Sequence, residues 1–81
     1  MTEVTVRVYG PLNDFLPQQR RQVSWWRLTD RHTSVKDLIE SLGVPHPEID
    51  LIVVNGTSVA FDYIVRTGDR IGVFPRFVAF D

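Results

Sequence analysis

Hydrophobic residues near the N-terminus recur at every second position. Val4, Val6 and Val8 alternate with Thr5, Arg7 and Tyr9 until Gly10-Pro11 interrupts the pattern. Because successive side chains of a strand point to opposite faces, a period of two predicts a strand with one buried valine face. The chain is therefore expected to begin with a half-buried β-strand.

A loop and a second strand are predicted next. Residues 11–19 combine turn-forming residues with the apolar pair Phe15-Leu16, and Pro17 directly after this pair excludes a helix core. Residues 21–28 are rich in β-branched and aromatic side chains, which favours a strand. We expect this strand to pair antiparallel with the first, with Trp25 and Trp26 on opposite faces.

A helical period follows. One apolar stripe is predicted at positions i, i+3, i+4 and i+7, namely Val35, Leu38, Ile39 and Leu42. Thr33-Ser34 supplies hydroxyl groups for the N-cap, and Gly43 suits the residue that follows the helix. About two turns are too short to be stable alone in water, so the stripe must pack on the sheet.

The C-terminal half predicts extended segments separated by turns. They are an extended connection over residues 44–50, a buried strand over 51–54, a tight turn at Asn55-Gly56, an edge piece over 57–59, a bend at Asp62-Tyr63, a turn over 67–69 and a strand over 70–74. Two strands, one short helix and further strands are the order of a β-grasp, an α+β fold. We expect a mixed sheet of four to five strands packed on one helix, with the domain over residues 1–76 and a tail over 77–81.

Composition narrows the function. A length of 81 residues allows one core, and nine basic against ten acidic side chains create no strong field for nucleic acid or membrane. The absence of cysteine removes disulfides, a thiolate nucleophile and the usual zinc site, while His32 and His46 lie in different loops without a second ligand at i+4. No cofactor or metal is expected. The N-terminus lacks a signal-peptide pattern and no apolar run could span a bilayer, so a cytoplasmic location is predicted.

Three local patterns resemble known families. They are Leu12 to Pro17 (LNDFLP), Ser34 to Pro45 (SVKDLIESLGVP) and Gly68-Asp69-Arg70-Ile71 with Val73 and Pro75. The last two resemble the bacterial β-grasp sulfur carriers, namely the small subunit of molybdopterin synthase and the thiamine sulfur carrier. Together with residues 48–56, all three look more like the ubiquitin-like domain that precedes the Mut-seven C-terminal RNase domain. That resemblance implies a PIN-like nuclease as partner, in cis or in trans.

The end of the chain separates the two resemblances. A sulfur carrier needs a C-terminal Gly-Gly, because only residues without side chains can thread into the activating enzyme. This sequence ends in Arg76-Phe77-Val78-Ala79-Phe80-Asp81, where bulky rings and a second carboxylate would obstruct that reaction. The expected function is therefore a non-catalytic interaction or regulatory module, with inhibition of the nuclease, as by an antitoxin, as one variant. Sulfur transfer and weak RNA binding remain the alternatives.

Catalytic residues are not expected, because no nucleophile with a base and no convergent carboxylates emerge from the pattern. Candidate partner-binding residues are the exposed aromatic and basic side chains, namely Phe15, Arg20, Arg21, Trp25, Trp26, Arg27, Phe77 and Phe80. Both tryptophans could instead serve the core and its rim. The arginines could form a solvated strand face, steer an acidic partner or contact an RNA backbone.

Overall fold

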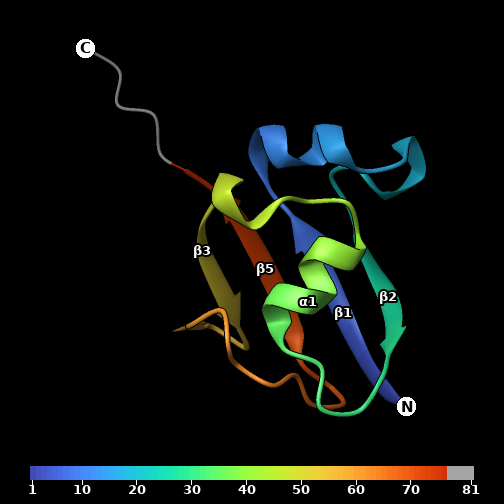
Figure 1. The fold of residues 1–81 in the computed structure, drawn as a ribbon. Helices are drawn as coiled ribbons and strands as arrows, with labels where there is room; N and C mark the ends of the chain where they lie inside the picture. Colours follow the sequence, from blue (N-terminus) through green and yellow to red (C-terminus); the bar gives the residue numbers. More distant parts are fainter. Residues whose placement is uncertain (77–81) are drawn as a thin grey trace.

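Five strands form one mixed sheet in the computed structural model, which describes residues 1–76. The strands are β1 (Thr2–Val8), β2 (Ser24–Thr29), β3 (Ile49–Val54), β4 (Thr57–Val59) and β5 (Arg70–Pro75). They lie side by side in the order β2-β1-β5-β3-β4 (Figure 1). β1 and β5 run parallel, whereas the other neighbouring pairs are antiparallel. The predicted α+β architecture is confirmed, and the predicted tail over 77–81 lies outside the described residues.

The core lies between one face of the sheet and α1 (Val35–Ser41), which crosses in front of β1 and β5 (Figure 1). Val4, Val6 and Val8 are all buried, as the alternation predicted. From α1, Val35, Leu38 and Ile39 are buried against this cluster. Full burial of one such side chain contributes about 1.5–3 kcal/mol, which explains how so short a helix is held in place.

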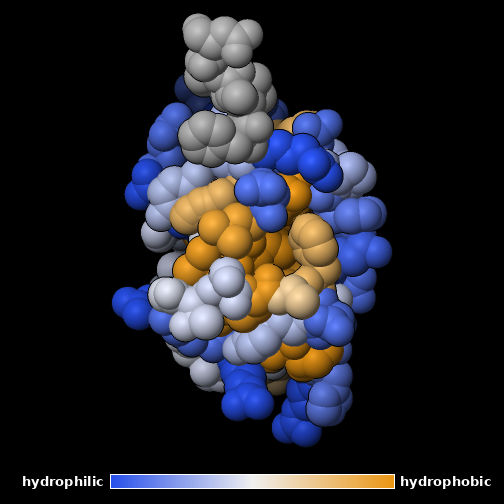
Figure 2. Space-filling view, turned by 90° about the vertical axis from the view of Figure 1, so that its left-hand side faces the viewer, coloured by the Kyte–Doolittle hydropathy of each residue, from blue (hydrophilic) through white to orange (hydrophobic). Residues whose placement is uncertain are grey.

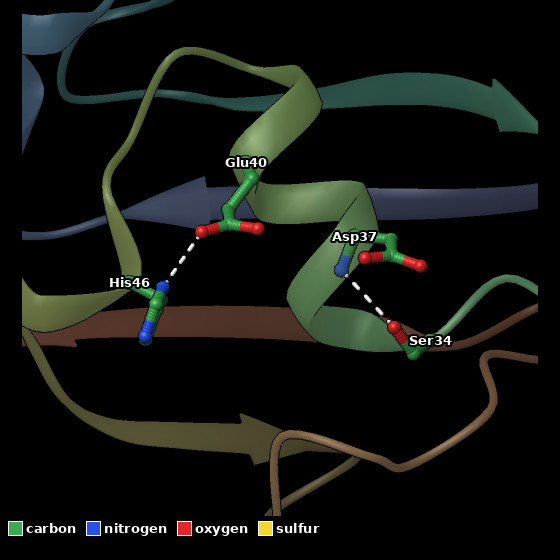
Figure 3. A network of polar contacts seen from close by, with 4 residues as sticks. All are labelled: Ser34, Asp37, Glu40 and His46. Carbon is green, nitrogen blue, oxygen red and sulfur yellow. Dashed lines mark hydrogen bonds and ion pairs between the residues drawn. The ribbon is translucent and has the colours of Figure 1, made fainter.

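Both ends of α1 follow the sequence prediction. The Ser34 hydroxyl accepts a hydrogen bond from the backbone N–H of Asp37 at 3.1 Å (Figure 3). Gly43 has φ +92°, a backbone conformation that a residue with a side chain adopts only at a cost. The N-cap and the glycine after the helix are therefore confirmed.

A side-chain contact joins α1 to the following 3-10 turn, η3 (His46–Glu48). Nδ1 of His46 lies 2.7 Å from Oε2 of Glu40 (Figure 3). The hydrogen bond to His46 lowers the pKa of Glu40 below its ordinary value, and the positive charge of Lys36 adds to the effect. Both side chains are exposed, so this contact between α1 and η3 contributes little to stability.

The predicted loop over residues 11–19 is wrong in detail. Two 3-10 helices, η1 (Gly10–Phe15) and η2 (Gln18–Arg20), occupy most of it. Pro11 can start η1 because the first helical residues need no backbone donor. Asn13 is buried; its side-chain amide donates to the carbonyl of Gly10 and its oxygen accepts from the N–H of Gln22. Local side-chain hydrogen bonds thus order a segment that lacks a hydrophobic period.

The start of two strands and the burial of one also differ from the prediction. β2 begins at Ser24, because Gln22 adopts a positive φ of 64° that ends the preceding segment in a turn. Residues 44–50 are not wholly extended, since η3 interrupts them and β3 begins at Ile49. β3 was predicted to be a buried central strand, yet Leu51 is 40% exposed and the central strand of the sheet is β5. A run of four apolar residues cannot show that one face of the sheet is left open.

The turns that lead into β4 and β5 meet at Asp69. Asn55 and Gly56 both have positive φ, as expected for the predicted tight turn between β3 and β4. Asp69 is buried, and its carboxylate accepts hydrogen bonds from Asn55 Nδ2 at 2.9 Å, the Tyr63 hydroxyl at 2.8 Å and the Arg66 N–H at 2.8 Å. The hydrogen bond between the Tyr63 hydroxyl and Asp69 raises the pKa of Tyr63, because losing the phenol proton would put two negative charges side by side.

Apolar side chains also reach the surface. On the side of the molecule that lies on the left in Figure 1, hydrophobic residues gather in the middle of the visible surface and hydrophilic residues surround them (Figure 2). Isolated exposed apolar residues are normal, whereas a contiguous group is typical of a contact surface.

No helix within residues 1–76 is long and apolar enough to cross a membrane.

Candidate binding surface

One face of the sheet points away from α1 and carries the side chains that alternate with the core residues. We call this surface the open face. It consists of Glu3, Thr5, Arg7, Tyr9, Ser24, Trp26, Leu28, Leu51, Val53, Ser58, Arg70, Gly72 and Phe74. Four of its large hydrophobic residues are substantially exposed, namely Tyr9, Trp26, Leu28 and Leu51.

The strand register arranges these residues in rows across the sheet. Ser24, Arg7, Gly72, Val53 and Ser58 lie side by side from β2 to β4. The neighbouring row contains Trp26, Thr5 and Arg70. Residues far apart in the sequence are thus brought onto one surface by strand pairing alone.

Gly72 lies at the centre of this surface and leaves a hollow. The hollow has a volume of about 360 Å³ and is lined by Gly72 and, among others, by Arg7, Tyr9, Val53, Arg70 and Phe74. A Cβ atom added at Gly72 would meet the Tyr9 ring at 3.5 Å and the Phe74 ring at 3.6 Å, which are ordinary van der Waals contacts. The backbone there thus tolerates a side chain, and a larger one would occupy part of the hollow.

Two aromatic rings form one wall of the hollow. Tyr9 and Phe74 stack with their ring centroids 4.4 Å apart and their planes inclined by 22°. The guanidinium carbon of Arg7 lies 5.0 Å from the centroid of the Tyr9 ring, a cation–π contact. Arg7 is thereby held against the sheet instead of extending into solvent, which fixes a positive charge beside an apolar wall.

Trp26 is the predicted partner-binding residue that the structure places on the open face. It is 72% exposed and pairs across the strands with Thr5, next to the hollow. Trp25 points to the opposite face, pairs with Val6 and is partly buried against the core. The predicted separation of the two tryptophans is confirmed, and the hypothesis that tryptophan serves the core holds for Trp25 alone.

The other candidates are scattered. The guanidinium of Arg20 lies 5.8 Å from the Trp25 ring centroid, and Arg21 Nε donates to the carbonyl of Leu16 at 3.0 Å. Arg27 pairs with Val4 on the helix side of the sheet, and its buried Nε has no hydrogen-bond partner among the described residues. Phe15 is 45% exposed at the end of η1, and Phe77 and Phe80 lie outside the described residues. These residues do not join Trp26 in a single surface within the described part of the chain.

Sequence reasoning missed Arg7, Tyr9, Arg70, Gly72 and Phe74 as candidate binding residues. A signal was present, because the alternation that buries Val6 and Val8 sends Arg7 and Tyr9 to the other face. The same alternation along β5 separates Arg70, Gly72 and Phe74 from buried Ile71 and Val73. What the sequence could not show was that β1 and β5 are parallel neighbours.

The comparisons with known proteins fit this architecture. The model of the family described as Mut7-C ubiquitin matches residues 1–81 of the chain. The chain belongs to this family. The resemblance noted in the sequence is confirmed, and the family match extends from the first residue to the last. A search of curated proteins found no significant match.

Solved structures of ubiquitin-like proteins share the fold. Small archaeal modifier protein 1 of Haloferax volcanii has a TM-score of 0.71 at 16% identity, with 95% of this chain and 100% of that chain covered. A putative molybdopterin-converting factor subunit 1 of Pyrococcus furiosus has a TM-score of 0.69 at 24% identity, with 95% and 100% covered. At these identities the likeness establishes the ubiquitin-like β-grasp fold.

A third neighbour was solved in an assembly. It is the protein–protein complex of subunits 1 and 2 of molybdopterin-converting factor from Helicobacter pylori, with a TM-score of 0.60 at 16% identity and with 98% of this chain and 100% of that chain covered.

Within residues 1–76, no group of three or more histidine, aspartate or glutamate side chains is placed to hold a metal ion. The open face carries apolar, aromatic and cationic groups.

Proposed function

We propose that this chain is a non-catalytic module that binds and regulates a Mut-seven type, PIN-like RNase domain, in cis or in trans. The observation that carries the proposal is the open face, on which Trp26 is 72% exposed beside a hollow with an aromatic wall. Tryptophan, tyrosine and arginine are the residues that contribute most to binding energy at protein interfaces. Membership of the Mut7-C ubiquitin family supports the choice of partner.

The energetics favour a contact role over a role in folding. Leaving a large apolar side chain in water forgoes about 1.5–3 kcal/mol relative to burial. The open face leaves Tyr9, Trp26, Leu28 and Leu51 substantially exposed together, although the core on the other face is complete without them. A partner that covers this face would recover the burial energy of all four, so association is expected to be driven by apolar contact.

Regulation of the nuclease is the expected consequence of association. A PIN-like RNase cleaves RNA with acidic residues that hold metal ions, and a small domain docked near these residues would restrict access of the RNA. Inhibition of this kind would make the chain antitoxin-like. The same docking could instead hold the nuclease in an active arrangement, and an RNA cleavage assay separates the two results.

Titration of a purified Mut-seven type RNase domain with this chain tests the proposal. We expect saturable binding by isothermal titration calorimetry and a parallel fall in the rate of cleavage of a fluorescent RNA. Trp26→Ala should weaken binding by about tenfold or more, the usual effect of removing an interface tryptophan. Val23→Ala is the matched control, because Val23 is 44% exposed but lies outside the open face. Absence of binding by the wild-type chain would refute the proposal.

Sulfur transfer is the second candidate, and the fold shared with the Pyrococcus furiosus converting-factor subunit favours it. In that role the C-terminal carboxylate would be adenylated and converted to a thiocarboxylate. Incubation of the chain with an activating enzyme, ATP and a sulfur donor, followed by intact-mass measurement, decides between the two candidates. A mass increase equal to the exchange of one oxygen for sulfur would support the carrier; an unchanged mass with intact nuclease binding would exclude it.

A further inference from the structure

The hollow on the open face has an uneven distribution of charge. Arg7 and Arg70 both line it, and none of its lining residues is an aspartate or a glutamate. Glu3, an acidic residue of the open face, pairs with Leu28 and does not line the hollow. The hollow is therefore a cationic site on a chain whose net charge is −1, and an anionic group is the chemistry that fits it.

Arg7 lines the hollow, and one donor of its side chain lacks a hydrogen-bond partner among the described residues. Its Nε is buried and has no hydrogen-bond partner within the described residues, while its guanidinium rests near the Tyr9 ring. Arg7 as a whole is only partly exposed and lines the hollow, so an anion there interacts with its charge more strongly than with that of an arginine in solvent. The only ion pair among the described residues is that between Glu40 and His46, which leaves Arg7 available.

Arg70 is fixed by its backbone rather than by its side chain. Its N–H donates to Asn55 Oδ1 at 2.9 Å, and its carbonyl accepts from the Asn55 N–H at 2.9 Å. Arg70 pairs with Thr5 and Gly72 pairs with Arg7, so the two arginines are diagonal neighbours on adjacent strands. Two like charges at this spacing repel each other, and an anion between them would relieve the repulsion.

The aromatic wall argues for a peptide rather than a nucleic acid. A single-stranded RNA in the hollow would bind through bases stacked on the rings that line it, and the exposed ring of Trp26 is not one of these. The Tyr9 ring already stacks on the Phe74 ring and contacts the guanidinium of Arg7, so stacking a base on Tyr9 would displace one of these contacts. A carboxylate needs no free ring, because it can accept two parallel hydrogen bonds from a guanidinium while its own methylene groups contact the wall.

From these observations we propose that the hollow over Gly72 binds the carboxylates of an extended acidic segment of the partner protein. The inference rests on the proposed function, which supplies the partner, and adds the chemistry of the segment that the partner contributes. In an extended peptide, alternate side chains share a face. Carboxylates at positions i and i+2 can therefore reach Arg7 and Arg70 together, while an adjacent apolar residue covers Trp26.

The hollow can be tested without the nuclease by fluorescence anisotropy with labelled probes. The probes are a short peptide in which glutamate alternates with serine, the same peptide with glutamine in place of glutamate, and an oligouridine RNA of similar length. We expect binding of the glutamate peptide, at least tenfold weaker binding of the glutamine peptide, and weakening by added salt. No binding of the glutamate peptide, or tighter binding of the oligouridine, would overturn the inference.

Variants locate the peptide on the molecule. Arg7→Gln and Arg70→Gln should each weaken the glutamate peptide about tenfold, since each removes charged hydrogen bonds. Gly72→Val should weaken it by occupying part of the hollow, and Arg31→Gln is the control because Arg31 is exposed and does not line the hollow. Arg70 is exposed as well, so its variant should keep the wild-type melting curve. Equal affinity of all variants and the wild type would overturn the assignment to this hollow.

The same variants with the nuclease separate this inference from the proposed function. If Arg7→Gln with Arg70→Gln abolishes nuclease binding while Arg31→Gln does not, both proposals gain support. If the double variant binds the nuclease as the wild type does and Trp26→Ala does not, the acidic segment is refuted while the proposed function stands. If the wild-type chain fails to bind the nuclease, the proposed function is refuted, and the peptide titration alone then decides whether the hollow binds carboxylates.

Discussion

The hydroxyl of Tyr63 donates a hydrogen bond to Oδ2 of Asp69 across 2.8 Å, and this contact joins the long connection after β4 to the turn before β5. Asp69 also accepts from Asn55 and from the backbone of Arg66, while its carbonyl accepts from the N–H of Thr5. Asp69 thus contacts β1 through its backbone carbonyl, and the β3–β4 turn and the connection before β5 through its buried carboxylate. Because Arg70 is the next residue, the same cluster positions one side of the hollow on the open face.

Replacement of Asp69 by alanine is expected to lower the free energy of unfolding by about 3 kcal/mol. The substitution removes the acceptor of three part-buried hydrogen bonds, those from Asn55, Tyr63 and Arg66, and each such bond contributes about 1 kcal/mol. Urea unfolding followed by circular dichroism measures the effect. Asp62→Ala is the control, since Asp62 is exposed; equal loss in both variants would contradict this role of Asp69.

Tyr63→Phe isolates a single bond of that cluster. We expect a loss of about 1–2 kcal/mol, because the hydroxyl donates to a charged acceptor. The raised pKa of Tyr63 also predicts a pH dependence. A folded-state pKa above the unfolded value contributes stability that is complete below the unfolded pKa, about 10, and is lost as pH rises through the folded pKa. Ultraviolet titration of the phenols should show a late ionisation, and the Tyr63→Phe variant should lack it.

The lowered pKa of Glu40 predicts that the stability of the fold depends on pH in the acidic range. Its pKa is lowered in the folded state, chiefly by the hydrogen bond to His46. Stability from a depressed pKa is present above the unfolded value, about 4.3, and is lost as pH falls through the lower folded value. Melting temperatures of the wild type and Glu40→Gln should therefore differ at neutral pH and converge in strong acid. Parallel curves over the whole range would show that the contact with His46 adds no stability.

The two adjacent tryptophans are expected to separate folding from binding. Trp25→Ala should cost about 2 kcal/mol of unfolding free energy, because Trp25 is partly buried against the core. Trp26→Ala should stay within about 0.5 kcal/mol of the wild type, as is usual for an exposed residue, yet weaken nuclease binding. Chemical unfolding and calorimetric titration of both variants measure the two effects. A large loss of stability in Trp26→Ala would assign it to the fold instead.

Much of the fold could be predicted from local patterns. The valines of β1, the cap and stripe of α1 and the turns at Asn55-Gly56 and Gly68 follow from period and backbone preference, and all appear in the structure. The wrong prediction of a loop over residues 11–19 has a physical cause. Asn13 orders η1 through hydrogen bonds to Gly10 and Gln22, and such bonds leave no periodic signal in the sequence.

In β1 and α1 the sequence by itself determined which residues face the core and which point away from it, because side-chain direction follows from the period of each element. The tertiary structure alone decided which outward residues meet. Arg7 and Gly72 are 65 positions apart, the difference of their residue numbers, and become neighbours because β1 and β5 pair in parallel. The hollow, its two arginines and its aromatic wall arise from that non-local pairing, which hydrogen bonds between distant strands fix and no local pattern encodes.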